Sequence, residues 1–166
     1  EQIVHQADAK ALSAFGINLG YNALSHGAAI IRQIEAAEGF NVPWCLTLVS
    51  GDGRVSLSPG DMERTIEDGK ALGIYCYLIY VDEAYPHVEE LLRMIGEEPD
   101  CAFLLFCGGS LIDDSFCEAL TRAPNTAVAL DIGAPQEDRL AKAANQLLAA
   151  GNVCGGFAYV SRLQAR

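Results

Sequence analysis

The chain has 166 residues, of which 51% are hydrophobic, and its 22 acidic residues outnumber its 11 lysines and arginines to give a net charge of −11. This length allows one domain with a sizeable core, and the hydrophobic content excludes a disordered chain. Because nucleic-acid binding requires a basic face, so acidic a chain is not expected to have nucleic acid as a partner.

The apolar runs bear on the expected cellular location of the protein. The longest of them, such as residues 74–81 and 101–107, have the length of strands, so neither a membrane span nor a membrane partner is expected. No basic segment followed by an apolar one marks a signal peptide, and the expected location is the cytoplasm. The chain begins with Glu1 rather than Met, which is consistent with a single domain over residues 1–166 cut from a longer protein.

Six cysteines raise the question of disulfides or metal. None forms a CxxC pair, and most fall in apolar runs, where a cysteine acts as a small buried hydrophobe of a reducing compartment. Buried thiols are therefore the first interpretation, and a metal site built from neighbouring strands stays open. The cysteines are Cys45, Cys76, Cys101, Cys107, Cys117 and Cys154.

The first third of the chain begins with a short predicted helix over residues 2–14. An apolar run at 15–19 predicts the first strand, and a helix with isoleucines on one side follows over 22–38. Residues 45–49 predict the second strand. The Gly-Asp-Gly sequence within 49–55 indicates either a small β-hairpin or a long loop above the strand ends.

The middle third alternates clearly between helix and strand. The sequence SPGD at 58–61 is typical of a capped helix start, and Gly73 ends that helix. A strand over residues 74–81 is followed by a helix over 85–96, which also stops at a glycine. The next strand covers residues 101–107.

The last third repeats the same unit after a glycine-rich turn. A helix is predicted over residues 113–122 and a strand over 126–131. The final helix has acids in its first turn and runs from about residue 135 to Gly151. A last strand covers residues 153–160.

The six predicted strands start at residues 15, 45, 74, 101, 126 and 153, at intervals of 25 to 30 residues. Most are continuously apolar, which is typical of parallel strands covered on both faces. Six repeated β-α units with right-handed crossovers predict an α/β fold with a parallel sheet. The regular spacing favours a (β/α) barrel or partial barrel, although a complete one needs about 250 residues. An open doubly wound sheet is the alternative.

Residues 129–162, with the sequence ALDIGAPQEDRLAKAANQLLAAGNVCGGFAYVSR, resemble a βαβ unit of the tryptophan synthase α-subunit family. The shared features are a helix start with proline and acids, a helix rich in leucine and alanine, and a strand ending in Tyr-Val-Ser-Arg. The resemblance implies a barrel-like fold. The glycine-rich loop expected next is replaced by residues 163–166, so the family's lyase activity is not carried over.

Ligands of parallel α/β folds bind beyond the carboxyl ends of the strands, so residues just after the predicted strands are the candidates. The two glycines after residue 107 allow close approach of a ligand, and the following helix offers free N–H groups to an anion. A tight turn is the alternative for this segment. The predicted ligand-binding residues are Asn18, Asn22, Asp52, Gly108, Gly109 and Ser110.

Three carboxylates, those of Asp82, Glu83 and Asp131, follow predicted strands. Together they are able to hold Mg²⁺ or to act as acid and base on a sugar-like substrate, and the alternative is that each caps the next helix. His26 lies one helical turn beyond the first predicted strand and is expected to face the same rim. The predicted catalytic residues are Asp82, Asp131 and His26. No motif indicates a cofactor, since GxGxxG and Walker A patterns are absent.

These features favour a domain that binds a small-molecule ligand at the carboxyl-end rim of its sheet. If it is an enzyme, a lyase, isomerase or hydrolase of a sugar-like or phosphorylated metabolite is expected. The alternative is a non-catalytic regulatory or assembly domain of a larger protein or complex. A further option is that exposed strand edges pair with a second copy, so that a homo-oligomer completes a core that one chain cannot close.

Overall fold

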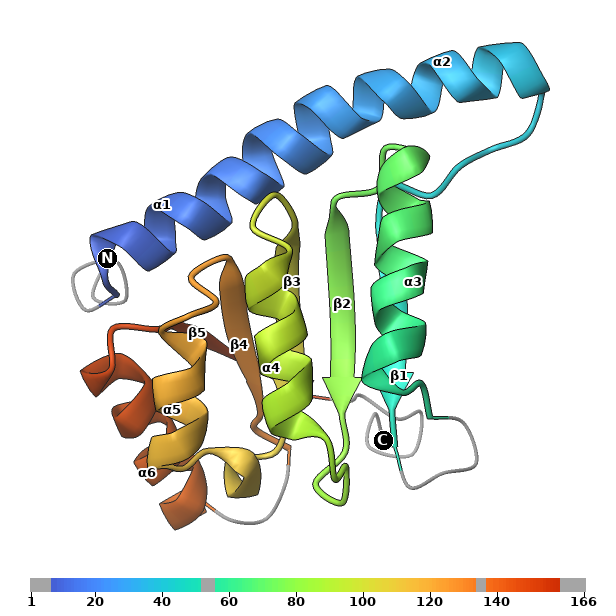
Figure 1. Ribbon diagram of the computed structural model, residues 1–166. Helices are drawn as coiled ribbons and strands as arrows, with labels where there is room; N and C mark the ends of the chain where they lie inside the picture. Colours follow the sequence, from blue (N-terminus) through green and yellow to red (C-terminus); the bar gives the residue numbers. More distant parts are fainter. Residues whose placement is uncertain (1–6, 52–55, 134–136, 159–166) are drawn as a thin grey trace, which may run out of the picture.

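The computed structural model describes residues 7–51, 56–133 and 137–158 and contains an open sheet of five strands in the order β1-β2-β3-β4-β5 (Figure 1). Every neighbouring pair is parallel, which confirms the predicted α/β class. Within these residues the sheet does not close into a barrel, and β1 and β5 form its edges. The strands are β1 (Leu46–Ser50), β2 (Cys76–Val81), β3 (Ala102–Cys107), β4 (Thr126–Asp131) and β5 (Val153–Phe157).

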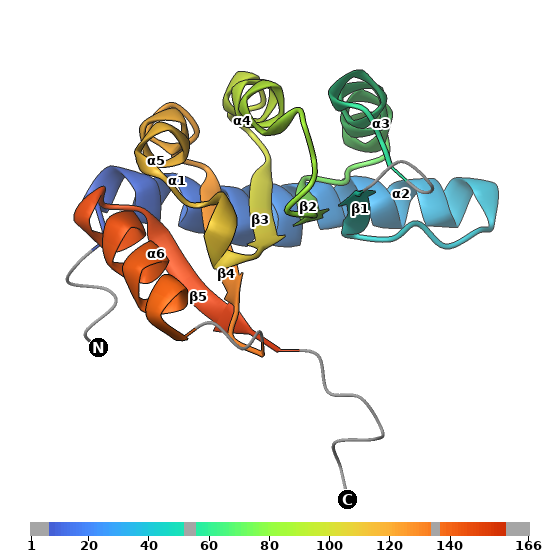
Figure 2. The ribbon, with the colours of Figure 1, turned by 90° about the horizontal axis from the view of Figure 1, so that it is seen from below.

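Four helices connect the strands and lie along the convex side of the curved sheet (Figure 2). Each connection moves the chain to the next strand in the same direction. Because such crossovers are right-handed, all four helices fall on the same face. They are α3 (Pro59–Ala71), α4 (Val88–Glu97), α5 (Asp114–Leu120) and α6 (Glu137–Ala149), and a 3₁₀ turn, η3 (Gly109–Leu111), precedes α5.

The ends of these helices agree with the sequence signals. At the start of α3, the Ser58 hydroxyl accepts a hydrogen bond from the Asp61 N–H, and the Asp61 carboxylate accepts one from the Ser58 N–H. Asp113 caps α5 by accepting from a backbone N–H three residues later. Gly73 and Gly151 follow α3 and α6 with φ of 90° and 76°, where glycine is favoured over other residues.

One long helix crosses the amino ends of the strands (Figure 1). It consists of α1 (Ala9–Ile17), the wider π-helical segment η2 (Asn18–Gly27) and α2 (Ala28–Glu38). The predicted strand at 15–19 is therefore wrong, and the first predicted β-α unit is not formed. No helix in the described part of the chain is long and apolar enough to cross a membrane.

The buried side of the long helix explains why the strand prediction failed. A five-residue apolar run does not separate a strand from part of a helix, and only the longer pattern does. The buried positions recur at intervals close to helical turns and include the polar Asn18, which no apolar template detects. They are Ala11, Asn18, Ala23, Gly27 and Ile31.

The main core lies between the sheet and helices α3 to α6. Tyr77 of β2 and Phe103 of β3 are fully buried there, and their rings stack with centroids 5.7 Å apart. The Tyr77 hydroxyl donates to the carbonyl oxygens of Ile66 and Ile74, at 3.1 and 2.9 Å. This tyrosine therefore fixes α3 and its following turn to the sheet.

The concave face of the sheet is also apolar. The register places Leu78 beside Leu104 and Tyr80 beside Phe106, and all four side chains are half-buried. The Tyr80 and Phe106 rings stack at 4.4 Å, and the Phe157 ring meets Phe106 edge-on at 5.1 Å. Helices α3 to α6 lie on the opposite face, so this surface has the character of a core without a helical layer over it.

Candidate functional site

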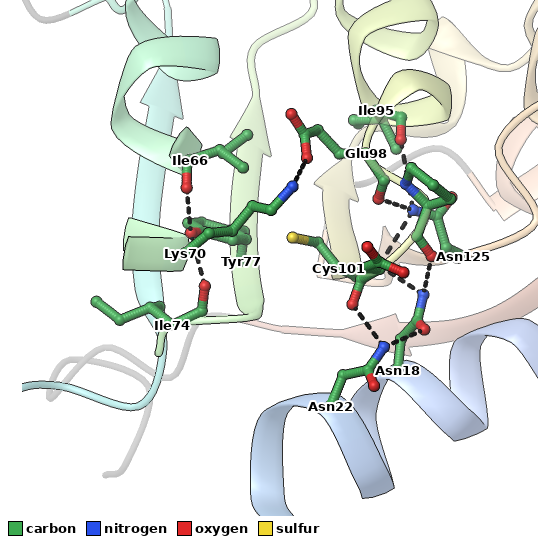
Figure 3. Close-up of polar contacts among 12 residues, drawn as sticks. Asn18, Asn22, Ile66, Lys70, Ile74, Tyr77, Ile95, Glu98, Cys101 and Asn125 are labelled. Carbon is green, nitrogen blue, oxygen red and sulfur yellow. Dashed lines mark hydrogen bonds and ion pairs between the residues drawn. The ribbon is translucent and has the colours of Figure 1, made fainter. Parts of the chain in front are cut away.

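Asn18 and Asn22 lie at the opposite end of the sheet from the predicted rim. They belong to η2, which crosses the amino ends of the strands, so their expected position after a strand is corrected (Figure 3). The Asn18 amide donates to the carbonyl oxygens of Pro99 and Cys101 at 2.6 and 2.9 Å. The Asn22 amide donates to the Asp100 carbonyl at 2.9 Å. Both residues fasten the long helix to the loop before β3.

His26 is also at this amino end, for the same reason. Its imidazole is exposed, and its ring centroid lies 5.9 Å from that of Tyr75, just before β2. A residue at the amino ends of the strands is separated from the rim acids by the length of the sheet. The structure therefore does not bring His26 together with Asp82 and Asp131.

A buried polar cluster beside Asn18 was not predicted from the sequence. The Asn125 amide donates to the carbonyl oxygens of Glu98 and Cys101 at 2.8 and 3.0 Å, with a longer contact to Ile95 (Figure 3). Glu98 itself pairs with Lys70 at 2.6 Å. An asparagine before a strand reads as a turn residue, so the sequence carries no signal of this role. The cluster is structural, because its acceptors are main-chain carbonyls.

The carboxyl-end rim contains Asp82 and Asp131, as predicted. The register of β2, β3 and β4 places Gly108 between them, so the two acids are two strand spacings apart, about 10 Å. Each carboxylate accepts from a backbone N–H two residues later, Asp82 from Ala84 and Asp131 from Gly133, both at 2.8 Å. These are local turn bonds and not the capping of the next helix that the sequence left as the alternative, since α4 begins only at Val88, after His87 at its N-cap. Asp52 lies outside the described residues.

Glu83 occupies the space above Gly108. A Cβ atom on Gly108 would lie 3.3 Å from the Glu83 Cγ and would overlap its carboxylate, so a larger residue at position 108 requires the exposed Glu83 side chain to move. The negative charge of Glu83 also adds to burial in raising the pKa of Cys107 to about 12. Of the three rim carboxylates, that of Glu83 therefore lies over the end of β3.

Gly109 and Ser110 line a different feature, a cavity of about 370 Å³ between η3 and α6. Gly109 packs directly on α6, because a Cβ at this position would lie 3.5 Å from the Ala143 Cβ. The cavity thus joins the end of β3 to the first half of α6. It is lined by Gly109, Ser110, Ile112, Asp113, Arg139, Lys142, Ala143 and Gln146.

Two cations distinguish this cavity. Arg139 and Lys142 are three residues apart on α6, which places them on the same side of the helix. Neither forms an ion pair within the described residues, although the chain is strongly acidic. The arginines and lysines that do form ion pairs there are Arg64 with Asp61, Lys70 with Glu98, Arg93 with Glu97, and Arg122 with Glu118.

The acids beside the cavity are occupied by other partners. Asp113 accepts from the Phe116 N–H and from the Ser115 hydroxyl, and the first of these bonds lowers the pKa of its carboxyl group. Asp114 accepts from the Gln146 amide at 3.0 Å. The negative charges of Asp113 and Asp114 act against the binding of an anion at this turn. The lowered pKa keeps Asp113 ionised, so its charge at the cavity opposes an anion, and Arg139 and Lys142 are the two lining cations that offset it.

The cavity and the rim acids lie on different faces of the sheet. Leu130 of β4 is buried in the core with Ala143 of α6. Because side chains alternate along a strand, Asp131 points to the concave side. Gly109 and Ser110 are therefore brought together with cations that the sequence did not indicate, and they are separated from Asp82 and Asp131.

Two further findings concern alternatives to this cavity. Among the residues that the structure describes, no group of three or more His, Cys, Asp or Glu side chains is arranged to hold a metal ion. A larger groove of about 640 Å³ lies between α4 and α5, but its arginines, Arg93 and Arg122, are paired with Glu97 and Glu118 across single helical turns.

Comparisons of the chain with protein-family models, with curated protein sequences and with solved structures gave no match. The resemblance of residues 129–162 to a tryptophan synthase α-subunit unit thus has no support from these comparisons. A function for this chain is therefore inferred only from the geometry of the described residues.

Proposed function

We propose that the protein binds a small anionic metabolite, such as a phosphorylated one, in the cavity between η3 and α6. The observation that supports this most is the joint placement of Arg139 and Lys142, both without ion pairs in the described part of the chain, beside Gly109 and Ser110. Two cations near a turn with small residues allow an anion to approach both the side chains and the backbone. What sets these two cations apart from Lys10 and Arg32, for which no ion pair is found in the described residues either, is that both line one cavity.

The size of the cavity fits this class of ligand. A volume of about 370 Å³ lies at the lower end of the range of about 300–1,000 Å³ that is usual for small-molecule sites. If the protein is an enzyme, a lyase, isomerase or hydrolase reaction on a sugar-like metabolite remains the proposal. Asp82 and Asp131 are its acid and base candidates, and they face the concave side rather than this cavity.

Calorimetric titration with inorganic phosphate and with a small sugar phosphate tests the binding proposal. The variants Arg139→Gln and Lys142→Gln are each expected to weaken binding by about 10- to 150-fold, since one charge-assisted hydrogen bond is worth about 1.5–3 kcal/mol. Lys10→Gln removes an equal charge from α1, and binding should be unchanged. Equal weakening in all three variants would reduce the effect to net charge, and no binding by the wild-type protein would contradict the proposal.

A second candidate function is assembly, and the concave sheet face favours it. In this proposal two copies meet through that face and their strand edges, and together they form the barrel-like closure that five strands lack. Two chains of charge −11 repel each other, so contact between copies has to come from the apolar patch formed by Leu78 and Leu104 and not from charged groups.

The mass of the protein in solution, from light scattering, tests assembly. A dimer is expected at micromolar concentration, and Leu104→Glu should shift it to monomer because it places a charge on the concave face. Leu72→Glu is the control, since Leu72 is 38% exposed in the turn after α3. A monomeric wild-type protein would exclude this second candidate and leave the anion-binding proposal unaffected.

A further inference from the structure

We infer that Cys45 and Cys76 are a site of reversible oxidation and form a disulfide when the protein meets a peroxide. Cys45 directly precedes β1 and Cys76 opens β2. The register that pairs Leu46 with Tyr77 therefore places the two cysteines opposite each other. Neighbouring strands lie about 4.8 Å apart, within the Cα separation of about 4.4–6.8 Å that a disulfide bridges. Register partners also point to the same face of a sheet.

The two thiols differ in their chemistry. The hydrogen bond from the Cys76 thiol lowers the pKa of Cys45, which favours a thiolate there. The same contact, followed by burial, raises the pKa of Cys76 and keeps it neutral. Cys45 is half-buried and within reach of a small oxidant, whereas Cys76 is buried. Cys45 is thus suited to react first, and Cys76 to complete the bond.

The reaction balances with hydrogen peroxide as the oxidant. The Cys45 thiolate attacks one peroxide oxygen, an S–O bond forms, the O–O bond breaks, and the leaving hydroxide takes a proton to become water. The Cys76 sulfur then attacks the Cys45 sulfenic acid, its proton leaves with the oxygen as a second water, and the S–S bond forms. Two thiols are oxidised and one peroxide is reduced.

Cys154 offers a matched control within the chain. It is half-buried like Cys45, but burial raises its pKa, so its thiolate is disfavoured. Cys101 and Cys107 are buried, and their pKa values are raised to about 12. Oxidation by a small amount of peroxide is therefore expected at Cys45 before the other thiols.

Peptide mapping tests the inference directly. The reduced full-length chain is treated with hydrogen peroxide, free thiols are alkylated under denaturing conditions, and trypsin then cleaves between the two cysteines, at Arg54, Arg64 and Lys70. A cross-linked peptide pair containing Cys45 and Cys76 is expected, and dithiothreitol should separate it. The fluorescence of Trp44, the single tryptophan, should fall on oxidation and recover on reduction, because it adjoins Cys45.

Variants of single cysteines show which thiol reacts with peroxide and which one closes the disulfide. Cys45→Ser should abolish the cross-link and the fluorescence change, Cys76→Ser should leave a sulfenic acid that dimedone traps, and Cys154→Ser should behave as wild type. Alkylation of both Cys45 and Cys76 in the oxidised wild-type protein would overturn the inference. So would a link between Cys45 and any other cysteine. The wild-type result alone decides the question if a variant does not fold.

Discussion

Gly27 of the long N-terminal helix and Gly73 of the turn after α3 pack backbone against backbone at the amino ends of the strands. A Cβ atom on Gly73 would lie 2.7 Å from the Gly27 carbonyl oxygen, and a Cβ atom on Gly27 would overlap the carbonyl oxygen of Gly73. Neither neighbour is the flexible end of a side chain, so neither moves aside easily. These two glycines set the distance at which the long helix crosses the sheet.

The first prediction concerns this contact. Gly27→Ala should lower the free energy of unfolding by about 1–3 kcal/mol, because the added methyl forces the helix away from the sheet. Gly16→Ala is the control on the same helix, where nothing lies within 4 Å of the added atom. That change should raise stability by up to about 1 kcal/mol through helix propensity. Urea denaturation measures both, and equal stability of the two variants would refute the packing argument.

The second prediction concerns the Asn125 amide, which is buried and satisfies main-chain carbonyl oxygens in the loop before β3. Asn125→Ala should lower the free energy of unfolding by about 2–3 kcal/mol, since buried acceptors lose their donor. Asn145 is exposed on α6, and Asn145→Ala should be neutral or slightly stabilising. Chemical denaturation compares the two. A loss below about 0.5 kcal/mol at position 125 would indicate that water replaces the amide.

Much of the fold followed from local chemistry. The Ser58 cap and the glycines after α3 and α6 mark helix ends through hydrogen bonding and backbone sterics, which act within a few residues. The predicted strand over 126–131 agrees with β4 at both ends. The run at 15–19 failed because its neighbour in space, the loop before β3 that Asn18 contacts, is distant in sequence.

The candidate site was predicted less completely. The position of Gly109 and Ser110 after a strand was evident, but their neighbours Arg139 and Lys142 read as ordinary surface residues of a later helix. The packing of η3 on α6 is what brings them together, and no spacing rule contains it. Asn18 was misplaced because its site assignment depended on the strand that is not formed.

The third prediction concerns the reciprocal cap of α3. Ser58→Ala should lower the free energy of unfolding by about 1 kcal/mol, because the Asp61 N–H loses its acceptor and the Asp61 carboxylate loses the Ser58 hydroxyl at 2.6 Å. Ser13→Ala within α1 is the matched control, since Ser13 is an exposed residue in a helix interior. Its effect should be smaller than about 0.5 kcal/mol. Similar losses at the two positions would show that the cap contributes nothing specific.

The buried thiols make the free energy of unfolding depend on pH in the alkaline range. Burial raises the pKa of Cys101 and Cys107 to about 12, whereas a cysteine in the unfolded chain has a pKa of about 8.5. Between these values the unfolded state has released protons that the folded state still holds. The stabilisation that these two protonated thiols contribute is therefore fully present below about pH 8.5 and is lost as the pH rises towards 12.

The fourth prediction follows from this loss of stability with rising pH. Between pH 9 and 10.5, the free energy of unfolding should fall by up to about 1.4 kcal/mol per pH unit for each of these two thiols. Cys107→Ala should reduce that slope by one such contribution, although the lost side chain also lowers stability at every pH. Leu105→Ala is the control, because it removes buried volume on the same strand without a titrating group. Its stability should be lower throughout, with the wild-type slope. Denaturant titrations across this pH range give the slope of the free energy of unfolding against pH. Equal slopes for the wild type and Cys107→Ala would mean that the Cys107 thiol ionises in the folded protein as readily as in the unfolded chain.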